Sequence, residues 1–280
     1  MMDDAFAAYG RHSPASDPGP FADRLPDRAT GDPATLCRLV QNLLLHDWGG
    51  RRLYGRPPPG LDFSARTTAP AAERLQRILA ADPRPLDAPR PPFERSVGTC
   101  RDFALLLACF CRQAGRAARL RCGFADYLSP GRREDHWICE IAAPESGGWR
   151  RADAQFDPAH CAAYAVDFDP SDLPAGRFLA ADEAWRAWRA GEAPAERFGH
   201  GDEGRGSWFL FVNLARDRLA LADRLTSPWD RWREVEAADR TLSAPQIEAA
   251  DRWAATAIEA PEQAPEPGPP PWSSATPRRR

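Results

Sequence analysis

The stretch VGTCRDFALLLACF, residues 97–110, places a cysteine where a glycine-containing turn gives way to a long apolar run. Phe103, Leu106 and Phe110 follow the spacing of a helix, and other apolar residues fill the opposite side as well. A helix that is apolar nearly all round lies in the interior of a protein, not on its surface. The stretch therefore predicts a central, buried helix that begins at Cys100.

The position of Cys100 at the start of this helix favours a reactive thiol. The unpaired N–H groups and the dipole of a helix N-terminus stabilise a thiolate relative to a neutral thiol. Thr99 is a suitable N-cap residue, and Asp102 stands three residues later, as in a capping box. Gly98 permits a close backbone approach in front of the sulfur. The alternative is a purely structural cysteine, which is the commoner role for a buried thiol considered alone.

The regions around the central helix predict an α+β fold. Apolar and polar residues alternate in three segments after the helix, and the turns between them are too short for parallel crossovers, so we expect an antiparallel sheet. These strands span residues 118–128, 136–142 and 149–156. Amphipathic spacing predicts further helices over residues 33–46, 71–81, 180–190 and 207–224. The central helix should pack on the sheet, with helical extensions on either side in the sequence.

Changes in composition divide the chain into four parts. Residues rich in proline and charge, with little to bury, are typical of irregular or disordered segments. We expect an irregular N-terminal arm (1–33), a catalytic core with N-terminal helices (34–165), a helical C-terminal extension (166–258) and a disordered, proline-rich tail (259–280). Deleting most of that tail, residues 261–280, should then change stability little.

The overall composition excludes several classes of protein. The net charge is −3, so the chain as a whole generates no strong field for nucleic acid or a membrane surface. The first residues lack the basic and apolar segments of a secretory signal, and no apolar run approaches the roughly 20 residues of a membrane span. The seven cysteines are then expected to be free thiols in a soluble, cytoplasmic protein.

A thiolate needs a base that accepts and returns its proton, and the base needs a group that orients it. Only His136 begins a predicted strand close after the central helix, and Asp153 on the next strand could reach its far imidazole nitrogen. Asp135 and Asp157 are rival carboxylates. The remaining histidines are expected in the arm, at a helix end and in loops: His12, His46, His160 and His200.

Three segments in this order resemble the transglutaminase-like superfamily of cysteine acyltransferases. They are GTCRDFALLLACFCRQAGRAARLRCGF, DHWICEI and GGWRRADAQFD. The family pattern is Gly-x-Cys at a helix start, a Gly-x-x-Ala-Arg strand, His-x-Trp and then Trp-x-x-x-Asp. Trp137 directly follows the histidine here, where the family more often has a small residue before the aromatic one. The resemblance covers residues 95–158.

The resemblance implies a papain-like core in which Cys100 is the nucleophile, His136 the general base and acid, and Asp153 the orienting carboxylate. The substrate would be a peptide, protein or small-molecule amide that forms a thioester with Cys100. An amine acceptor would give transamidation, and water would give deamidation or hydrolysis. A cysteine protease or amidase on the same core and an inactive interaction module are the alternatives. No nucleic-acid or membrane partner is expected, and the oligomeric state is left open.

No cofactor or metal is expected. Cys109 and Cys111 are two residues apart on a helix and face different ways, and no partner pair with ligand spacing accompanies them. No loop has acidic residues at the alternate positions that calcium requires. Cys109, Cys111, Cys122 and Cys139 are expected in the core. The aromatic segment at 207–224 is interpreted as a second core helix, not as a cofactor site.

Overall fold

Helix α5 (Cys100–Gln113) is the central helix of the fold and begins at the predicted residue. Its side chains are buried from Arg101 through Arg112, which confirms the interpretation of the apolar run. Burying one large aliphatic or aromatic side chain stabilises a fold by about 1.5–3 kcal/mol, so each large apolar residue of this helix contributes about that much. The helix contacts α2 (Pro33–Leu43), α4 (Ala71–Ala81) and β2 (Ser96–Gly98).

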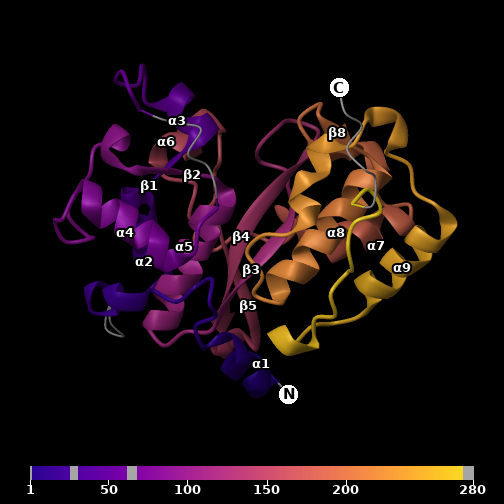
Figure 1. The fold of residues 1–280 in the computed structure, drawn as a ribbon, viewed down its shortest axis with the longest axis horizontal. Coiled ribbons are helices and arrows are strands. Elements are labelled where there is room, and N and C mark those ends of the chain that lie inside the picture. Colours follow the sequence, from indigo (N-terminus) through magenta and orange to yellow (C-terminus); the bar gives the residue numbers. More distant parts are fainter. Residues whose placement is uncertain (1, 26–30, 62–67, 274–280) are drawn as a thin grey trace. The chain divides into compact units, whose positions relative to one another are not determined.

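The computed structural model describes residues 2–25, 31–61 and 68–273. The chain forms two compact units: unit 1 comprises residues 1–121 and 136–177, and unit 2 comprises residues 122–135 and 178–280. Figure 1 labels α2, α4 and α5, which belong to unit 1, and α7, α8 and α9, which belong to unit 2. This division differs from the predicted one, because residues 122–135 join the helical extension and the N-terminal arm joins the core.

Unit 1 contains most of residues 95–158, the range that carries the resemblance described above. Its remaining helices and strands are α1 (Met2–Tyr9), β1 (Leu44–His46), α3 (Asp47–Leu53), β5 (Gly148–Ala152) and α6 (Pro158–Ala163), with short 3-10 helices η1 (Gly19–Arg24), η3 (Pro92–Glu94) and η4 (Pro144–Ser146). Strands β1 and β2 pair in parallel, and His46 is in register with Gly98. This pairing brings the end of β1 next to the turn that precedes Cys100.

The main sheet is mixed, with mostly antiparallel pairs. Its order is β6–β3–β4–β7–β8, and β5 also pairs with β4. The strands are β3 (Ala118–Ala125), β4 (Arg133–Ala143), β6 (Phe178–Ala180), β7 (Phe198–His200) and β8 (Gly204–Arg205). The pair β4–β5 is antiparallel as predicted, whereas β4 and β7 are parallel over two residues. A long connection separates β4 from β7, and it removes the constraint that a short turn imposes. The α+β prediction is confirmed.

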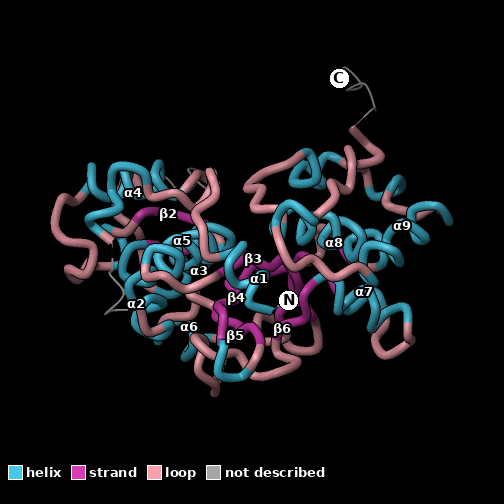
Figure 2. Tube along the Cα trace, turned by 90° about the horizontal axis from the view of Figure 1, so that it is seen from below, coloured by secondary structure: helices cyan, strands magenta, loops and turns pink. Residues whose placement is uncertain are grey.

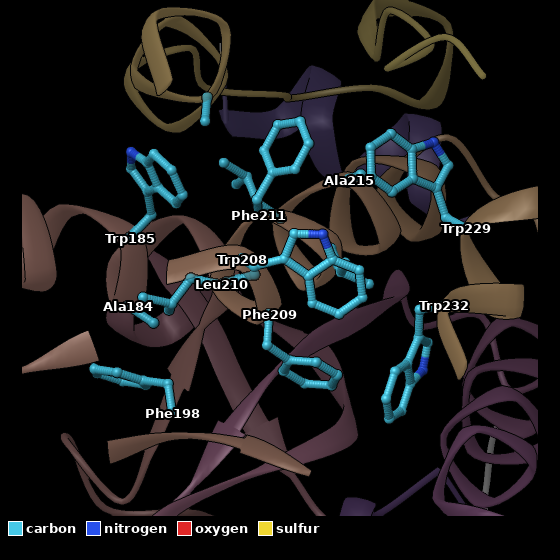
Figure 3. Close-up of a cluster of buried hydrophobic side chains, with 14 of the residues drawn as sticks. Ala184, Trp185, Phe198, Trp208, Phe209, Leu210, Phe211, Ala215, Trp229 and Trp232 are labelled. Atoms are coloured by element: carbon cyan, nitrogen blue, oxygen red, sulfur yellow. The ribbon is translucent and has the colours of Figure 1, made fainter. Parts of the chain in front are cut away.

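Unit 2 is built around α8 (Ser207–Leu221), whose side chains are buried from Trp208 to Leu221. It contacts α7 (Ala181–Arg189) and α9 (Ala244–Ala255), and Figure 2 shows these helices side by side. In Figure 3, Trp185 of α7, Phe211 of α8 and Trp229 lie in one aromatic cluster. The segment is a core helix, as predicted. Short 3-10 helices complete the unit: η5 (Ala195–Arg197), η6 (Pro228–Glu234), η7 (Ala237–Asp239) and η8 (Pro261–Gln263).

The two terminal segments are more ordered than the composition suggested. In the N-terminal arm, Tyr9 is fully buried and its ring contacts Trp149 at 5.7 Å. In the tail, the indole of Trp272 packs against Trp229 at 5.1 Å, and Trp229 Nε1 donates to the carbonyl of Gly268 at 2.9 Å. A few aromatic contacts thus hold segments that are otherwise rich in proline. Residues 274–280 of the tail lie outside the described residues.

Candidate active site

Cys100 is half-buried at the first position of α5, and its turn is held by the side chain of Asp102. Asp102 Oδ2 accepts hydrogen bonds from Thr99 N at 2.7 Å and from Thr99 Oγ1 at 3.0 Å. This is the predicted capping box. A Cβ atom at Gly98 would lie 3.0 Å from the Cβ of Asp102, so the glycine permits the close turn in front of the thiol. The local sequence therefore fixes where the helix and its cysteine begin.

A buried arginine from α4 completes this turn. Arg74 donates to Asp102 Oδ1 at 2.7 Å and to the carbonyl of Val97 at 2.7 Å. Both Arg74 and Asp102 are about as buried as core residues, at 2% exposure each. The sequence prediction missed Arg74. A signal was present, since Arg74 stands on the apolar stripe of α4 together with Leu75 and Ile78.

His136 and Asp153 form a buried pair within unit 1. His136 Nε2 lies 2.7 Å from Asp153 Oδ2, and the side chains are 2% and 1% exposed. His136 is on β4, and Asp153 directly follows β5, which is paired with β4. The second oxygen of Asp153 accepts from Gln155 N at 3.0 Å, and the ring of Phe156 meets the imidazole edge-on at 6.3 Å. These contacts hold both partners in one orientation.

The surroundings of His136 favour its protonated form. Burial lowers the pKa of His136, but the charge and hydrogen bond of Asp153 and a hydrogen bond with Cys100 outweigh it and raise the pKa to about 10. Because Nε2 faces Asp153, Nδ1 is the nitrogen left to exchange a proton with the thiol. The structure thus brings Cys100, His136 and Asp153 together in the predicted order.

The two rival carboxylates are engaged elsewhere. Asp135 lies in unit 2, where Arg216 Nη1 is 3.2 Å from Oδ2 and Asn213 Nδ2 is 2.9 Å from Oδ1. Burial opposes ionisation, but chiefly the charge of Arg216 lowers the pKa of Asp135. Asp157 caps α6 and pairs with His160. Asp153 is the one of the three candidates with a hydrogen bond to His136.

The other histidines differ from their predicted settings in three cases: His160 and His200 lie in a helix and a strand and not in loops, and His46 ends a strand and not a helix. His160 is in α6 and 2% exposed, not in a loop. It was missed because α6 is too short to show a helical period. His46 ends β1 and caps α3 by accepting from Gly49 N at 3.1 Å. His12 contacts Gln113, and His200 is part of β7.

The remaining cysteines have the character of structural thiols. All seven are free. Cys109, Cys111, Cys122 and Cys139 are fully buried, as predicted. Burial raises the pKa of Cys37, Cys109 and Cys139, which keeps these thiols neutral. Cys100 differs from these three in being partly exposed and in having an imidazole partner.

Neither a cluster of metal ligands nor a membrane-spanning helix is found in the part of the chain that the structure describes. Over residues 2–25, 31–61 and 68–273, no group of three or more His, Cys, Asp or Glu side chains is arranged to hold a metal ion. Within the same ranges, no helix has the length and apolar character to cross a bilayer.

Comparison with known proteins points to one superfamily. Residues 74–154 match the model of the core of the transglutaminase-like superfamily, and the match contains Cys100, His136 and Asp153. No curated protein matches the chain. A solved structure of a candidate cysteine protease from Cytophaga hutchinsonii is 16% identical, with a TM-score of 0.34, over 54% of this chain and 42% of that protein's chain. A similarity this weak carries no argument about fold or function, and the chain spans less than half of that protein.

Proposed function

We propose, from the match of residues 74–154 to the model of the transglutaminase-like core, that the protein is a cysteine acyl-transfer enzyme acting on amides. Cys100 is the nucleophile, His136 the general base and acid, and Asp153 the residue that orients His136. The observation that carries the proposal is the buried contact of 2.7 Å between His136 and Asp153, with His136 also hydrogen-bonded to Cys100.

In the first half of the reaction, the Cys100 sulfur attacks the amide carbonyl and the developing oxyanion is stabilised by backbone donors. The N–H of Cys100 at the start of α5 is one such donor, because the first N–H groups of a helix have no partner within the helix. His136 then protonates the leaving amine or ammonia from Nδ1, the C–N bond breaks, and a thioester remains on Cys100. Asp153 holds the imidazole in the orientation that both proton transfers require.

In the second half, an acceptor attacks the thioester carbonyl and the Cys100 thiolate leaves. A primary amine as acceptor completes transamidation, whereas water completes deamidation or hydrolysis. The half-buried position of Cys100 allows the substrate carbonyl to reach the sulfur from solvent. The alternatives are a protease that uses the same three residues and a core without catalytic activity.

The experiment measures ammonia release from a glutamine-containing peptide, with and without a primary amine. We expect the wild type to release ammonia and Cys100→Ala to release none. A covalent amine–peptide product identifies transamidation, and peptide-backbone cleavage without ammonia identifies a protease. If Cys100→Ala and the wild type behave identically across amide, peptide and ester substrates, the acyl-transfer proposal is wrong.

A further inference from the structure

An exposed tryptophan on α3 stands apart from the other aromatic residues of the chain. Trp48 is 50% exposed, and no other large apolar side chain in the described ranges is as exposed. Arg52, four residues later on the same helix, places its guanidinium carbon 4.2 Å from the centre of the Trp48 ring. Neither residue takes part in the steps proposed above. Together they present a flat apolar surface and a cation to solvent.

Arg52 carries a positive charge that its neighbours do not neutralise. Its side chain is exposed, and within the part of the chain that the structure describes no carboxylate lies at ion-pair distance from it. Asp47, the nearest acidic residue in the sequence, accepts a hydrogen bond from Trp48 N at 2.7 Å and lies 3.5 Å from His46 Nδ1. A guanidinium that is ordered by an aromatic ring loses little further freedom when it binds a carboxylate.

The register of β1 and β2 places Trp48 near the nucleophile. These parallel strands end in register at His46 and Gly98. Trp48 and Cys100 each stand two residues beyond that pair, in the first turns of α3 and α5. Neighbouring strands lie about 4.8 Å apart, and both chains leave this pair at the same end. The indole and the half-buried thiol therefore lie at the same end of the strand pair.

A second series of contacts leads from Arg52 to the catalytic imidazole. The ring of Phe156 meets His136 at 6.3 Å and Tyr164 at 5.6 Å between centroids. Burial raises the pKa of Tyr164, and the charge of Arg52 opposes this rise, which places the guanidinium near that hydroxyl. Helix α3 also contacts α6, which ends at Tyr164, and Figure 1 shows the two helices beside each other. Trp48 and Arg52 thus adjoin both halves of the reacting pair.

We propose that Trp48 and Arg52 bind the acyl donor, and that this donor is a peptide segment with a carboxylate side chain near its reactive amide. This inference rests on the proposed function and names its substrate class. The apolar part of the segment packs on the indole, and its carboxylate pairs with the guanidinium. Both residues are exposed in the structure, so the donor reaches them without any rearrangement of the chain.

The two residue types favour a peptide over a small neutral amide. Tryptophan and arginine are among the residues that contribute most to binding at protein interfaces. The charge of Arg52 favours an acidic segment and disfavours a basic one. Because Arg52 is exposed, this preference is modest and is weakened by salt.

The test compares ammonia release from two glutamine peptides of equal length. Both have phenylalanine directly before the glutamine. One has glutamate, and the other serine, at the positions two residues before and two residues after it. The ratio of their kcat/KM values measures the acidic preference. As a separate readout, p-nitrophenyl acetate acylates Cys100 and has no group that could pair with Arg52, so its p-nitrophenolate burst reports the reactivity of the thiol alone.

We expect the wild type to prefer the glutamate peptide by at least about threefold at low ionic strength, and less as salt is added. Arg52→Gln should bring the ratio close to one through KM, with kcat unchanged, because the ion pair forms on binding. Trp48→Ala should raise KM for both peptides by about fivefold or more. Trp48→Phe should keep most of the affinity, since a flat ring remains. The burst should be unchanged in all three variants.

Arg77→Gln is the matched control, because Arg77 is an exposed arginine of α4 that pairs with Glu73. Its ratio and its KM values should equal those of the wild type. Ammonia release without an acidic preference in the wild type, or unchanged kinetics in Arg52→Gln or Trp48→Ala, overturns the donor site alone. A burst lost in both of these variants assigns the two residues to the fold and also overturns it. Absence of ammonia release from both peptides in the wild type overturns the proposed function and this inference with it.

Discussion

The carboxylate of Asp153 decides whether His136 can work as a base. In Asp153→Asn the amide can no longer balance an imidazolium, and burial then lowers the pKa of His136. We expect amide turnover to fall by about two to four orders of magnitude, as in enzymes whose orienting carboxylate is replaced by an amide. Ammonia release under saturating substrate measures this effect.

Asp135→Asn is the matched control for that change, because Asp135 immediately precedes His136 in the sequence. It should destabilise unit 2 by about 3–5 kcal/mol, since Arg216 loses its buried partner. Turnover at a temperature where the protein is folded should stay near that of the wild type. If Asp135→Asn impaired turnover as strongly as Asp153→Asn, the assignment of the orienting carboxylate would be wrong.

The raised pKa of His136 also makes stability depend on pH. An unfolded histidine has a pKa near 6.5, and in the folded protein the value rises to about 10. The stabilisation from protonated His136 is therefore fully present below about pH 6.5 and is lost as the pH rises through about 10. Urea unfolding of the wild type and His136→Gln at pH 6, 8 and 10 should show a difference in unfolding free energy that shrinks with pH. A difference that grows with pH would contradict the account.

At the scale of elements, α4 and α5 are joined through the buried pair Arg74–Asp102, which fixes the turn before Cys100. Arg74→Gln leaves the carboxylate of Asp102 buried without its partner, and we expect a loss of about 3–5 kcal/mol in unfolding free energy. The double variant Arg74→Gln with Asp102→Asn should recover part of that loss, because the lone buried charge is gone. Urea denaturation of the wild type, both single variants and the double variant gives the coupling energy. Additive losses would mean that the pair contributes no coupling.

The elements differ in how far the sequence could predict them. Helices α4 and α5 are set by local apolar spacing, and their predicted starts at residues 71 and 100 match the structure. The capping box and the His136–Asp153 contact also follow from short-range patterns. Arg74 and the pair His160–Asp157 could not be found in that way, because a buried polar contact depends on which distant elements the fold brings together. The parallel pairing of β4 with β7 was missed for the same reason.

At the scale of the whole chain, composition misled the prediction for the last segment. Proline and charge dominate residues 259–273, yet Trp272 packs against Trp208 and Trp229 in the aromatic cluster of unit 2. Composition averages over residues and cannot show that one indole has a place in a core. The net charge and the cysteine count, by contrast, are properties of the whole chain, and what they indicate about partners stays a prediction.

The contacts of Trp272 give a prediction for stability. Trp272 is partly buried, so Trp272→Ala should lower the free energy of unfolding by about 1–3 kcal/mol, less than for a fully buried tryptophan. Glu266→Gln in the same segment removes only an exposed ion pair with Arg224 and should change stability by less than about 0.5 kcal/mol. Thermal unfolding followed by near-ultraviolet circular dichroism measures both. If both substitutions changed stability negligibly, the aromatic contacts would not hold this segment, and the prediction of a disordered tail would stand.

The central claim is that Cys100 is the reactive thiol of the chain and works together with His136 and Asp153. Its most direct test is competitive alkylation with iodoacetamide at pH 6.5, read by peptide mass spectrometry, since no substrate need be known. Cys161 is the internal control, because it is also partly exposed and burial raises its pKa. We predict that Cys100 is alkylated at least about tenfold faster than Cys161 in the wild type, and that His136→Gln removes this difference. Equal alkylation rates at Cys100 and Cys161 in the wild type would contradict the account.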